Sequence, residues 1–432
     1  EARLLSLSKM PLPIPQKPRQ LIRNVQDLLE ALAKLLLNFA TAKDGASPAP
    51  EANFPALAIW RALHLFSRHL FISSLTATLP GKGIWKQLHQ TYDLARKLGI
   101  ADTVPDKAAR SFRNEYYAAV LLGCAQPTSF SGRDIFFLDR YLERFSEQVD
   151  TDIGAPLETQ VVFWISPESD VPATPYSRKP PPPGTPVRNF SCHRLVSLLE
   201  NQLTALAAGT PSKWINLPHF AATPAGLGVL NRLLQIWGKP GARRRFPRRS
   251  QNYRGELCLG FDSLRRLYGK LQQSVVRTSA WMITNESPDG YTVMHLSGKT
   301  QTITVGDVAA LRTESGDAWQ LCIIRWALSE NQEHIELGLQ ILAPRAYTAK
   351  LALPAQAEVE ACYWPALVLP ATPRLRPREA LVVPTGTLAG HSSKNLVLVI
   401  EQDNVEIREI GSIRCNERNG VIELYEITSA WN

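Results

Sequence analysis

Little in this 432-residue sequence suggests a secreted, membrane-spanning or zinc-dependent protein. Its six cysteines are scattered and form no CxxC pair, so neither a zinc ribbon nor a dense disulfide framework is expected. No stretch reaches the ~18 consecutive apolar residues of a membrane-spanning helix. The N-terminus also lacks the pattern of a secretory signal. These absences favour a reducing, cytoplasmic location.

Signatures of catalysis and metal binding are absent as well. The eight histidines form no HExxH motif, and the GKG at 81–83 lacks the spacing of a phosphate-binding P-loop. Cys192 and His193 are adjacent but have no recognisable acid partner. The sequence therefore predicts a protein that is not an enzyme and has no catalytic or metal-ligating residues.

The excess positive charge is confined to one segment. Residues 239–277 contain eleven basic and two acidic residues, which account for the whole net charge of +9. The rest of the sequence is balanced in charge. This pattern predicts a localised anion-binding site rather than a generally basic surface.

The first part of the sequence is typical of a helical domain, which we expect over residues 1–150. One amphipathic helix is indicated by apolar residues at the spacing of a single helical face. These residues are Leu21, Val25, Leu28, Leu29, Leu32, Leu35 and Leu36. Four more helices are predicted over residues 54–75, 84–98, 107–124 and 134–149.

A proline-rich segment interrupts the helices. Residues 167–188 contain eight prolines, four of them consecutive, so residues 151–190 are expected to form a linker or an extended strap over the surface. Residues 191–239 continue the helical part, with helices predicted at 192–208 and 224–237.

Short alternating runs dominate the remainder and predict β structure. Six runs between residues 240 and 345 are typical of a small antiparallel barrel. They cover residues 255–261, 279–284, 290–296, 307–312, 319–328 and 334–342. Residues 264–274 would form an inserted helix or loop. Residues 346–432 form a second β-rich domain, which could be a diverged copy of the first. The expected fold class is therefore multidomain α+β.

The arginine-rich run RRRFPRR at residues 243–249 is the first candidate for a binding site. Guanidinium groups can grip a phosphate with two hydrogen bonds and can stack on a base. Because Pro247 lies inside the run, an extended clamp is expected rather than a helix. The alternative is a solvated basic linker between the helical and β parts.

The second candidate is NESPDG at residues 285–290, where one predicted strand ends and the next begins. Asn285 and Ser287 could hydrogen-bond a ligand, and Gly290 would permit a positive φ or a close approach of the ligand. The alternative is an ordinary hairpin turn.

Together the two segments resemble a known family. An RxxxR element before a small barrel, followed on an early strand by (D/N)xSxxG, is the paired signature of PilZ domains. Here it reads Arg244-Arg245-Phe246-Pro247-Arg248 and Asn285-Glu286-Ser287-Pro288-Asp289-Gly290. The arginine register is ambiguous, because Arg245 and Arg249 also lie four apart. Residues 240–345 therefore resemble a PilZ-like β-barrel.

The resemblance implies binding of the bacterial second messenger cyclic di-GMP, as a monomer or a stacked dimer, with no further cofactor. The expected ligand-binding residues are Arg243, Arg244, Arg245, Arg248, Arg249, Asn285, Ser287 and Gly290. The helical domain would then bind an unknown protein partner and receive the signal from the barrel. The alternative function is a nucleic-acid-binding adaptor that uses the basic 239–277 segment.

Overall fold

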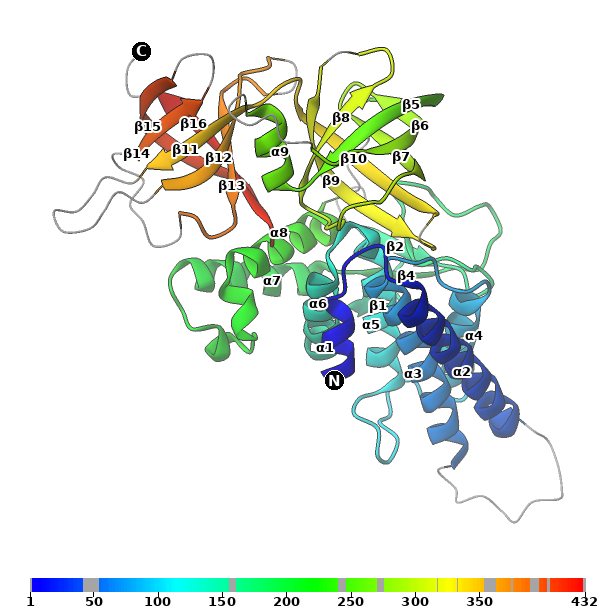
Figure 1. Cartoon of the computed structure of the whole chain (residues 1–432). Coiled ribbons are helices and arrows are strands. Elements are labelled where there is room, and N and C mark those ends of the chain that lie inside the picture. The colour runs from blue at the N-terminus through cyan, green and yellow to red at the C-terminus, as the bar shows by residue number, and fades with distance from the viewer. Residues whose placement is uncertain are drawn as a thin grey trace.

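Helices form the N-terminal half of the chain, and two β-barrels form most of the rest (Figure 1). The computed structural model describes residues 2–41, 54–154, 161–239, 246–269, 276–316, 318–331, 333–352, 363–373, 376–388, 396–401 and 405–429. Within these ranges no helix is long and apolar enough to cross a membrane. The predicted class, a helical domain followed by a barrel and a second β domain, is confirmed.

Helix α3 is the centre of the helical domain, and α2, α4, α5 and α6 pack around it. Its residue Leu63 is fully buried. Local caps begin two of the neighbouring helices, since the hydroxyl of Ser111 accepts the N–H of Asn114, and Ser131 and Asp134 form a capping box. The helices are α1 (Ala2–Ser8), α2 (Gln16–Thr41), α3 (Phe54–Leu75), α4 (Ile84–Lys97), α5 (Phe112–Cys124) and α6 (Gly132–Phe145). Short 3-10 turns follow two of these helices: η1 (Pro127–Ser129) comes after α5, and η2 (Ser146–Gln148) comes after α6.

The buried face of α2 does not coincide with its row of spaced apolar residues. Gln26 and Ala33 are buried, and the Gln26 amide donates to the hydroxyl of Ser73 on α3 at 2.8 Å. Leu28 and Leu35 are instead 58% and 63% exposed. Two other residues of that spacing, Leu29 and Leu36, are half-buried, and Leu36 packs on the core of the helical domain. Small and polar residues thus let α2 lie close against α3, while most of the spaced leucines remain exposed.

The proline-rich segment is more than a linker. It contributes three of the four strands of a small sheet, in the order β1-β4-β2-β3. Phe163 and Phe190 stack with ring centroids 5.2 Å apart, and both belong to the core of the helical domain. The Asp170 carboxylate accepts the N–H of Gly83 at 2.6 Å and so caps the start of α4 from a distant part of the chain. The strands are β1 (Asp150–Thr151), β2 (Val162–Ile165), β3 (Thr174–Pro175) and β4 (Arg188–Ser191).

Two further helices complete the helical part and lead to the barrels. They are α7 (His193–Ala207) and α8 (Pro224–Gly238), with the 3-10 turns η3 (Ser212–Ile215) and η4 (His219–Ala222) between them. Thr223 begins α8, and its hydroxyl accepts the N–H of Gly226 at 3.2 Å.

The middle barrel is a closed antiparallel sheet in the order β10-β7-β6-β5-β8-β9. Alternate residues point inward and form its core, with Trp281 and Ile283 fully buried. Each of the six predicted runs corresponds to one strand. The strands are β5 (Arg249–Leu259), β6 (Ser279–Ser287), β7 (Gly290–Ser297), β8 (Val308–Thr313), β9 (Gln320–Ser329) and β10 (Ile335–Ala343).

The C-terminal domain is a second closed barrel, in the order β11-β12-β13-β16-β15-β14. Counted from its own first strand, each barrel closes in the sequence first, second, third, sixth, fifth, fourth. The second barrel thus repeats the topology of the first. Its strands are β11 (Tyr347–Ala352), β12 (Tyr363–Leu369), β13 (Ala380–Pro384), β14 (Leu396–Glu401), β15 (Val405–Arg418) and β16 (Ile422–Ser429).

The inserted segment between β5 and β6 joins the two barrels. Its helix α9 (Phe261–Tyr268) lies between them in Figure 1. Leu264 of α9 is fully buried in an apolar cluster with Ile323 of the middle barrel and Leu367 of the second. The barrels therefore share a core, and α9 is part of it.

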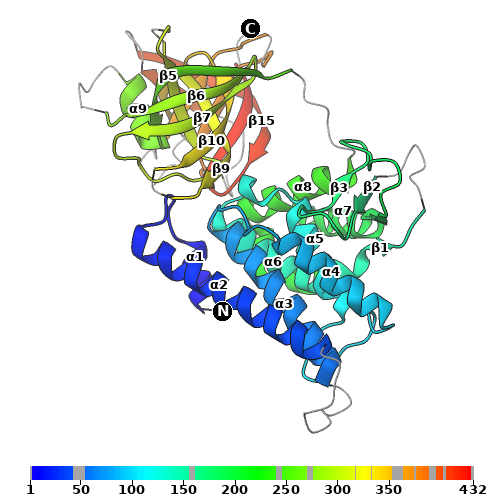
Figure 2. The same ribbon diagram turned by 90° about the vertical axis from the view of Figure 1, so that its right-hand side faces the viewer.

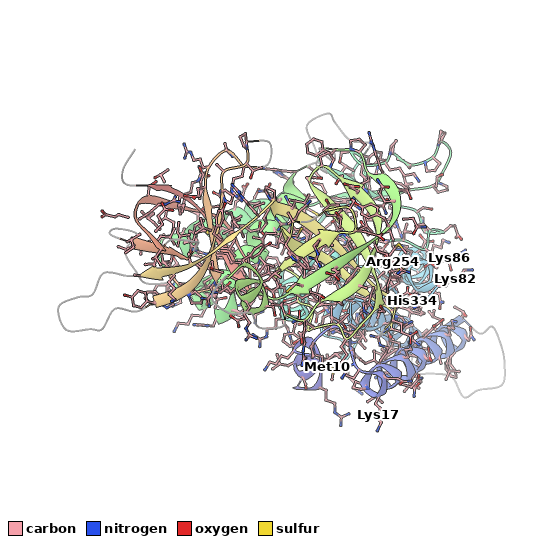
Figure 3. All side chains as sticks on the ribbon, turned by 45° about the horizontal axis from the view of Figure 1, so that its top comes forward. Met10, Lys17, Lys82, Lys86, Arg254 and His334 are labelled. Carbon is pink, nitrogen blue, oxygen red and sulfur yellow. The ribbon has the colours of Figure 1, made fainter. Side chains whose placement is uncertain are left out.

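The middle barrel also contacts the helical domain directly. The guanidinium of Arg19 on α2 donates to the Ser329 carbonyl at 3.1 Å, and the N–H of Ser329 donates to the Ala77 carbonyl at 2.8 Å. The segment between α1 and α2, where Figure 3 labels Met10, forms a β-bridge from Leu12 to Ile303. The end of β9 and the neighbouring loop are thus fixed to the helices.

Acid should weaken the helical domain through His89. This buried imidazole on α4 lies 2.8 Å from the Tyr116 hydroxyl and 2.9 Å from the Val171 carbonyl of the strap. Burial lowers the pKa of His89 from 6.5 to about 4. The unfolded chain therefore binds a proton first, and stability falls as the pH drops from 6.5 towards 4, by at most ~1.4 kcal/mol per pH unit.

Denaturant unfolding at pH 7 and pH 4.5 measures this effect. His89→Gln should show a smaller loss between the two pH values than the wild type, because glutamine has no proton to gain. An equal loss in both proteins would assign the acid sensitivity to other groups.

Candidate ligand-binding site

The signature segments lie on the outer face of the middle barrel. Five residues stand in direct register across five neighbouring strands: Ser250 opposite Asn285, Asn285 opposite Thr292, Thr292 opposite Gly338, and Gly338 opposite Trp326. Directly opposed residues of a sheet share a face. We call this row the motif face.

Arg248 reaches the motif face, whereas the next residue, Arg249, is not in the row of residues that forms this face. The Arg248 guanidinium lies 3.4 Å from the hydroxyl of Thr292, which is itself buried. Arg249 is paired with Glu286 instead. The Glu286 carboxylate accepts the Tyr253 hydroxyl at 3.1 Å, and Tyr253 packs on the barrel core. Of the two possible arginine registers, this arrangement favours the one that contains Arg248.

The other three arginines of the run, Arg243, Arg244 and Arg245, lie outside the described residues. Their role in ligand binding stays a prediction.

The NESPDG segment has two different parts. Asn285 is half-buried on the motif face beside Thr292. The Ser287 hydroxyl instead turns into the hairpin, 2.7 Å from Oδ1 of Asp289 and 3.1 Å from the Gly290 carbonyl oxygen. In this arrangement Ser287 holds the turn, and Asn285 is the side chain of the pair that lies on the motif face.

Gly290 is required by a neighbouring strand. Its φ is not among the positive values that other glycines adopt. A Cβ built at Gly290 would lie 2.2 Å from the carbonyl oxygen of Leu339 on β10. The close approach that Gly290 permits is therefore that of the β10 backbone.

The sequence reasoning missed Trp326. A Cβ at Gly338 would lie only 1.8 Å from Nε1 of Trp326, so the indole rests directly over this glycine, in the row that contains Thr292 and Asn285. The side chain is half-buried. The sequence signal that could have identified Trp326 is a tryptophan on the outer side of one strand opposite a glycine on the neighbouring strand. Recognising this signal requires knowledge of the strand register.

The motif face combines groups suited to an anionic heteroaromatic ligand. Arg248 supplies a guanidinium, Asn285 an amide, and Trp326 a ring surface for stacking. Among the described residues, no three His, Cys, Asp or Glu side chains are grouped so that they could hold a metal ion. The three side chains of the motif face can recognise a ligand by hydrogen bonds, charge and stacking.

Comparison with known proteins agrees with this geometry. Residues 1–156 match a family model described as the N-terminal domain of the cyclic-di-GMP receptor FimW, and residues 265–347 match its middle PilZ domain. The chain is thus a PilZ-domain protein that resembles FimW in both matched parts. The matched PilZ segment begins after the arginine-rich run and includes the NESPDG hairpin and Trp326.

Two individual proteins were also found. The cyclic-di-GMP receptor FimW of Pseudomonas aeruginosa is 21% identical over 447 residues, which cover 86% of this chain and 72% of that protein. A solved structure of MrkH, titled a c-di-GMP dependence transcription regulatory factor, is 10% identical and covers 41% of this chain and 77% of its own. Its TM-score of 0.16 is too low to support an inference.

Gly290→Ala tests whether this PilZ-domain protein needs the glycine for its fold. The new methyl group would push β7 away from β10, so we expect a loss of roughly 1–3 kcal/mol in unfolding free energy. Gly154→Ala is the control, because nothing lies within 4 Å of its Cβ. Thermal melts of both variants measure the difference. If Gly290→Ala melts like the wild type, the glycine is not needed for strand packing.

Proposed function

We propose that this protein is a cyclic di-GMP receptor of the bacterial cytoplasm that binds its ligand on the motif face and catalyses no reaction. The observation that carries the proposal is the convergence of Arg248, Asn285 and Trp326 on one face of a PilZ domain. The name of the Pseudomonas relative supports the identity of the ligand.

The chemistry of the ligand suits these side chains. Cyclic di-GMP presents two phosphodiesters and two guanines. A guanidinium fork can bind either a phosphate or the O6 and N7 of guanine, so Arg248 can serve both groups. The indole of Trp326 offers a surface on which a guanine can stack, a contact worth about 1–3 kcal/mol. The Asn285 amide can donate to a phosphate oxygen or to a base edge.

Binding would also engage the arginine-rich run. Arg243, Arg244 and Arg245 precede Arg248 in the chain, and Arg244 stands four residues before it, as the family motif requires. We propose that Arg244 and Arg248 hold the ligand together and that the other arginines add attraction, or hold a second, stacked ligand molecule. This segment connects α8 to β5 in the sequence, so its contacts with the ligand would change the link between the helical domain and the barrel.

A second route to the helical domain passes through Arg325 on β9. Gln340 pairs with Gly290 of the signature hairpin, and its amide oxygen accepts the Arg325 guanidinium at 2.6 Å. The same guanidinium makes two hydrogen bonds to the carboxylate of Glu417 on β15. The route therefore runs from the signature hairpin to the second barrel.

The route ends at α8. The tip of the β15–β16 hairpin is packed so closely on this helix that a Cβ at Gly228 would lie 2.3 Å from the Arg418 carbonyl oxygen. The Asn419 amide donates to the Gly306 carbonyl of the middle barrel at 2.9 Å. A cavity of about 1000 Å³ lies at this three-way junction and is lined by Arg232, Arg325 and Glu417, among others. We propose that the ligand shifts this junction and so changes the surface that the helical domain offers to a protein partner.

Titration calorimetry tests the ligand and the site. The wild type should bind cyclic di-GMP with a Kd near the micromolar range, or about −8 kcal/mol. Arg244→Ala and Arg248→Ala should each weaken binding by roughly tenfold or more, because a hydrogen bond to a charged group contributes about 1.5–3 kcal/mol. Trp326→Ala should have a similar effect through lost stacking. The melting temperature of the free protein should change little in the two arginine variants.

Arg266→Ala is the matched control for these variants. Arg266 is an exposed arginine of the same basic segment, on α9. A ligand that senses only the total charge would lose as much affinity in this variant as in Arg248→Ala.

Competition with DNA and RNA at ~150 mM salt distinguishes the receptor from the alternative, a nucleic-acid-binding adaptor. Non-specific binding to nucleic acid falls steeply with salt, so only a dinucleotide site should keep its selectivity under these conditions. Affinity that survives the loss of both Arg244 and Arg248 would refute the site.

Hydrogen exchange with and without cyclic di-GMP tests the second route. In the wild type the ligand should change the exchange rates of residues 415–422 and of the first two turns of α8. Glu417→Gln should still bind the ligand but transmit less of this change, because the charge that fixes Arg325 is lost. Glu406→Gln, on the exposed part of the same strand, is the control. Unchanged transmission in Glu417→Gln would exclude this route.

A further inference from the structure

The outer side of α2 carries an unusually long apolar stripe. Its five members are Leu21, Val25, Leu28, Leu32 and Leu35, which are 65%, 39%, 58%, 41% and 63% exposed. Single exposed leucines are common on protein surfaces, whereas a continuous row of this length usually marks an interaction site. Figure 2 shows α2 on the outer edge of the helical domain, beside α3.

The spacing of the stripe identifies the kind of partner. Successive members are four, three, four and three residues apart. This is the 3.5-residue repeat with which one helix packs along another in a coiled coil. Leu21, Leu28 and Leu35 occupy the d positions, and leucine at every d position favours two-stranded pairing. The stripe is therefore suited to a second helix that runs alongside α2.

The flank of the stripe allows this second helix to be another α2. The exposed g positions beside it are Asn24, Ala31 and Asn38, and none of them is charged. Two identical helices meeting here would bring no like charges together at these positions, which are those that normally select against self-pairing. A small residue in the middle, Ala31, allows close approach.

We propose that two copies of this chain associate through their α2 helices along this stripe. The helix has 26 residues and is therefore about 39 Å long. Pairing of two stripes with their flanks would remove on the order of 1,000 Å² of surface from water, the size at which specific interfaces begin. The proposal is independent of the cyclic di-GMP site, since the stripe lies on the helical domain.

Sedimentation velocity of the full chain over a range of concentrations tests the proposal. The wild type should sediment as a dimer of the 48.0 kDa chain. Leu28→Lys/Leu35→Lys should place positive charges against each other and weaken the dimer by at least 100-fold. Both residues are exposed, so circular dichroism and the melting temperature should report an unchanged fold. Leu21→Ser/Leu28→Ser is the second variant if the lysine pair folds poorly.

Leu98→Lys is the matched control. Leu98 follows α4 and is 55% exposed, so the change also removes an exposed leucine but lies off the stripe. It should leave the dimer intact. A wild type that stays monomeric at its highest soluble concentration would overturn the proposal, as would a dimer that survives the stripe variants or is lost in Leu98→Lys. A monomer that cosediments with phosphatidylglycerol vesicles would instead assign the stripe to a lipid surface.

Discussion

A β-bulge in β9 connects the three parts of this protein. Arg325 lies at the bulge, between Ile324, which pairs with Leu339, and Trp326, which pairs with Gly338. Trp326 therefore lies on the motif face while Arg325 reaches Glu417 in the second barrel. A few residues further on, Ser329 receives Arg19 from α2. One strand thus borders the candidate ligand site and both neighbouring domains, and a shift of β9 would be felt in all three.

Much of the fold could be predicted because its local and long-range signals agree. The six runs of the middle barrel alternate clearly and are separated by turn residues, so each run gives one strand. The predicted helix start at residue 134 lies close to the cap Ser131, whereas the predicted start at residue 107 comes five residues before α5 begins at Phe112. Asn285 and Arg248 could be chosen as candidates because their segments resemble the two-part signature of PilZ domains. The hairpin that contains Ser287 and Gly290 was also visible as a turn.

What could not be predicted depends on contacts between distant residues. Trp326 belongs to the motif face only because strand register sets it over Gly338. The proline-rich segment joins the helical core through Phe163, which no composition rule indicates. The apolar spacing of α2 indicates an amphipathic helix, but the choice of the face against α3 is made by close packing at Ala33. In each case the deciding neighbour lies far away in the sequence.

The shared topology of the two barrels makes the chain an asymmetric tandem. Only the middle barrel carries the (D/N)xSxxG sequence, because residues 346–432 contain no such pattern. Between the second and third strands of the other barrel, Arg376 donates to the carbonyl oxygens of Leu342 and Pro370 and so reinforces a joint. In the proposed function, the middle barrel would bind the ligand and the second barrel would support it. If the second barrel stays fixed, even a small rotation of the middle barrel would change the shape of the whole chain.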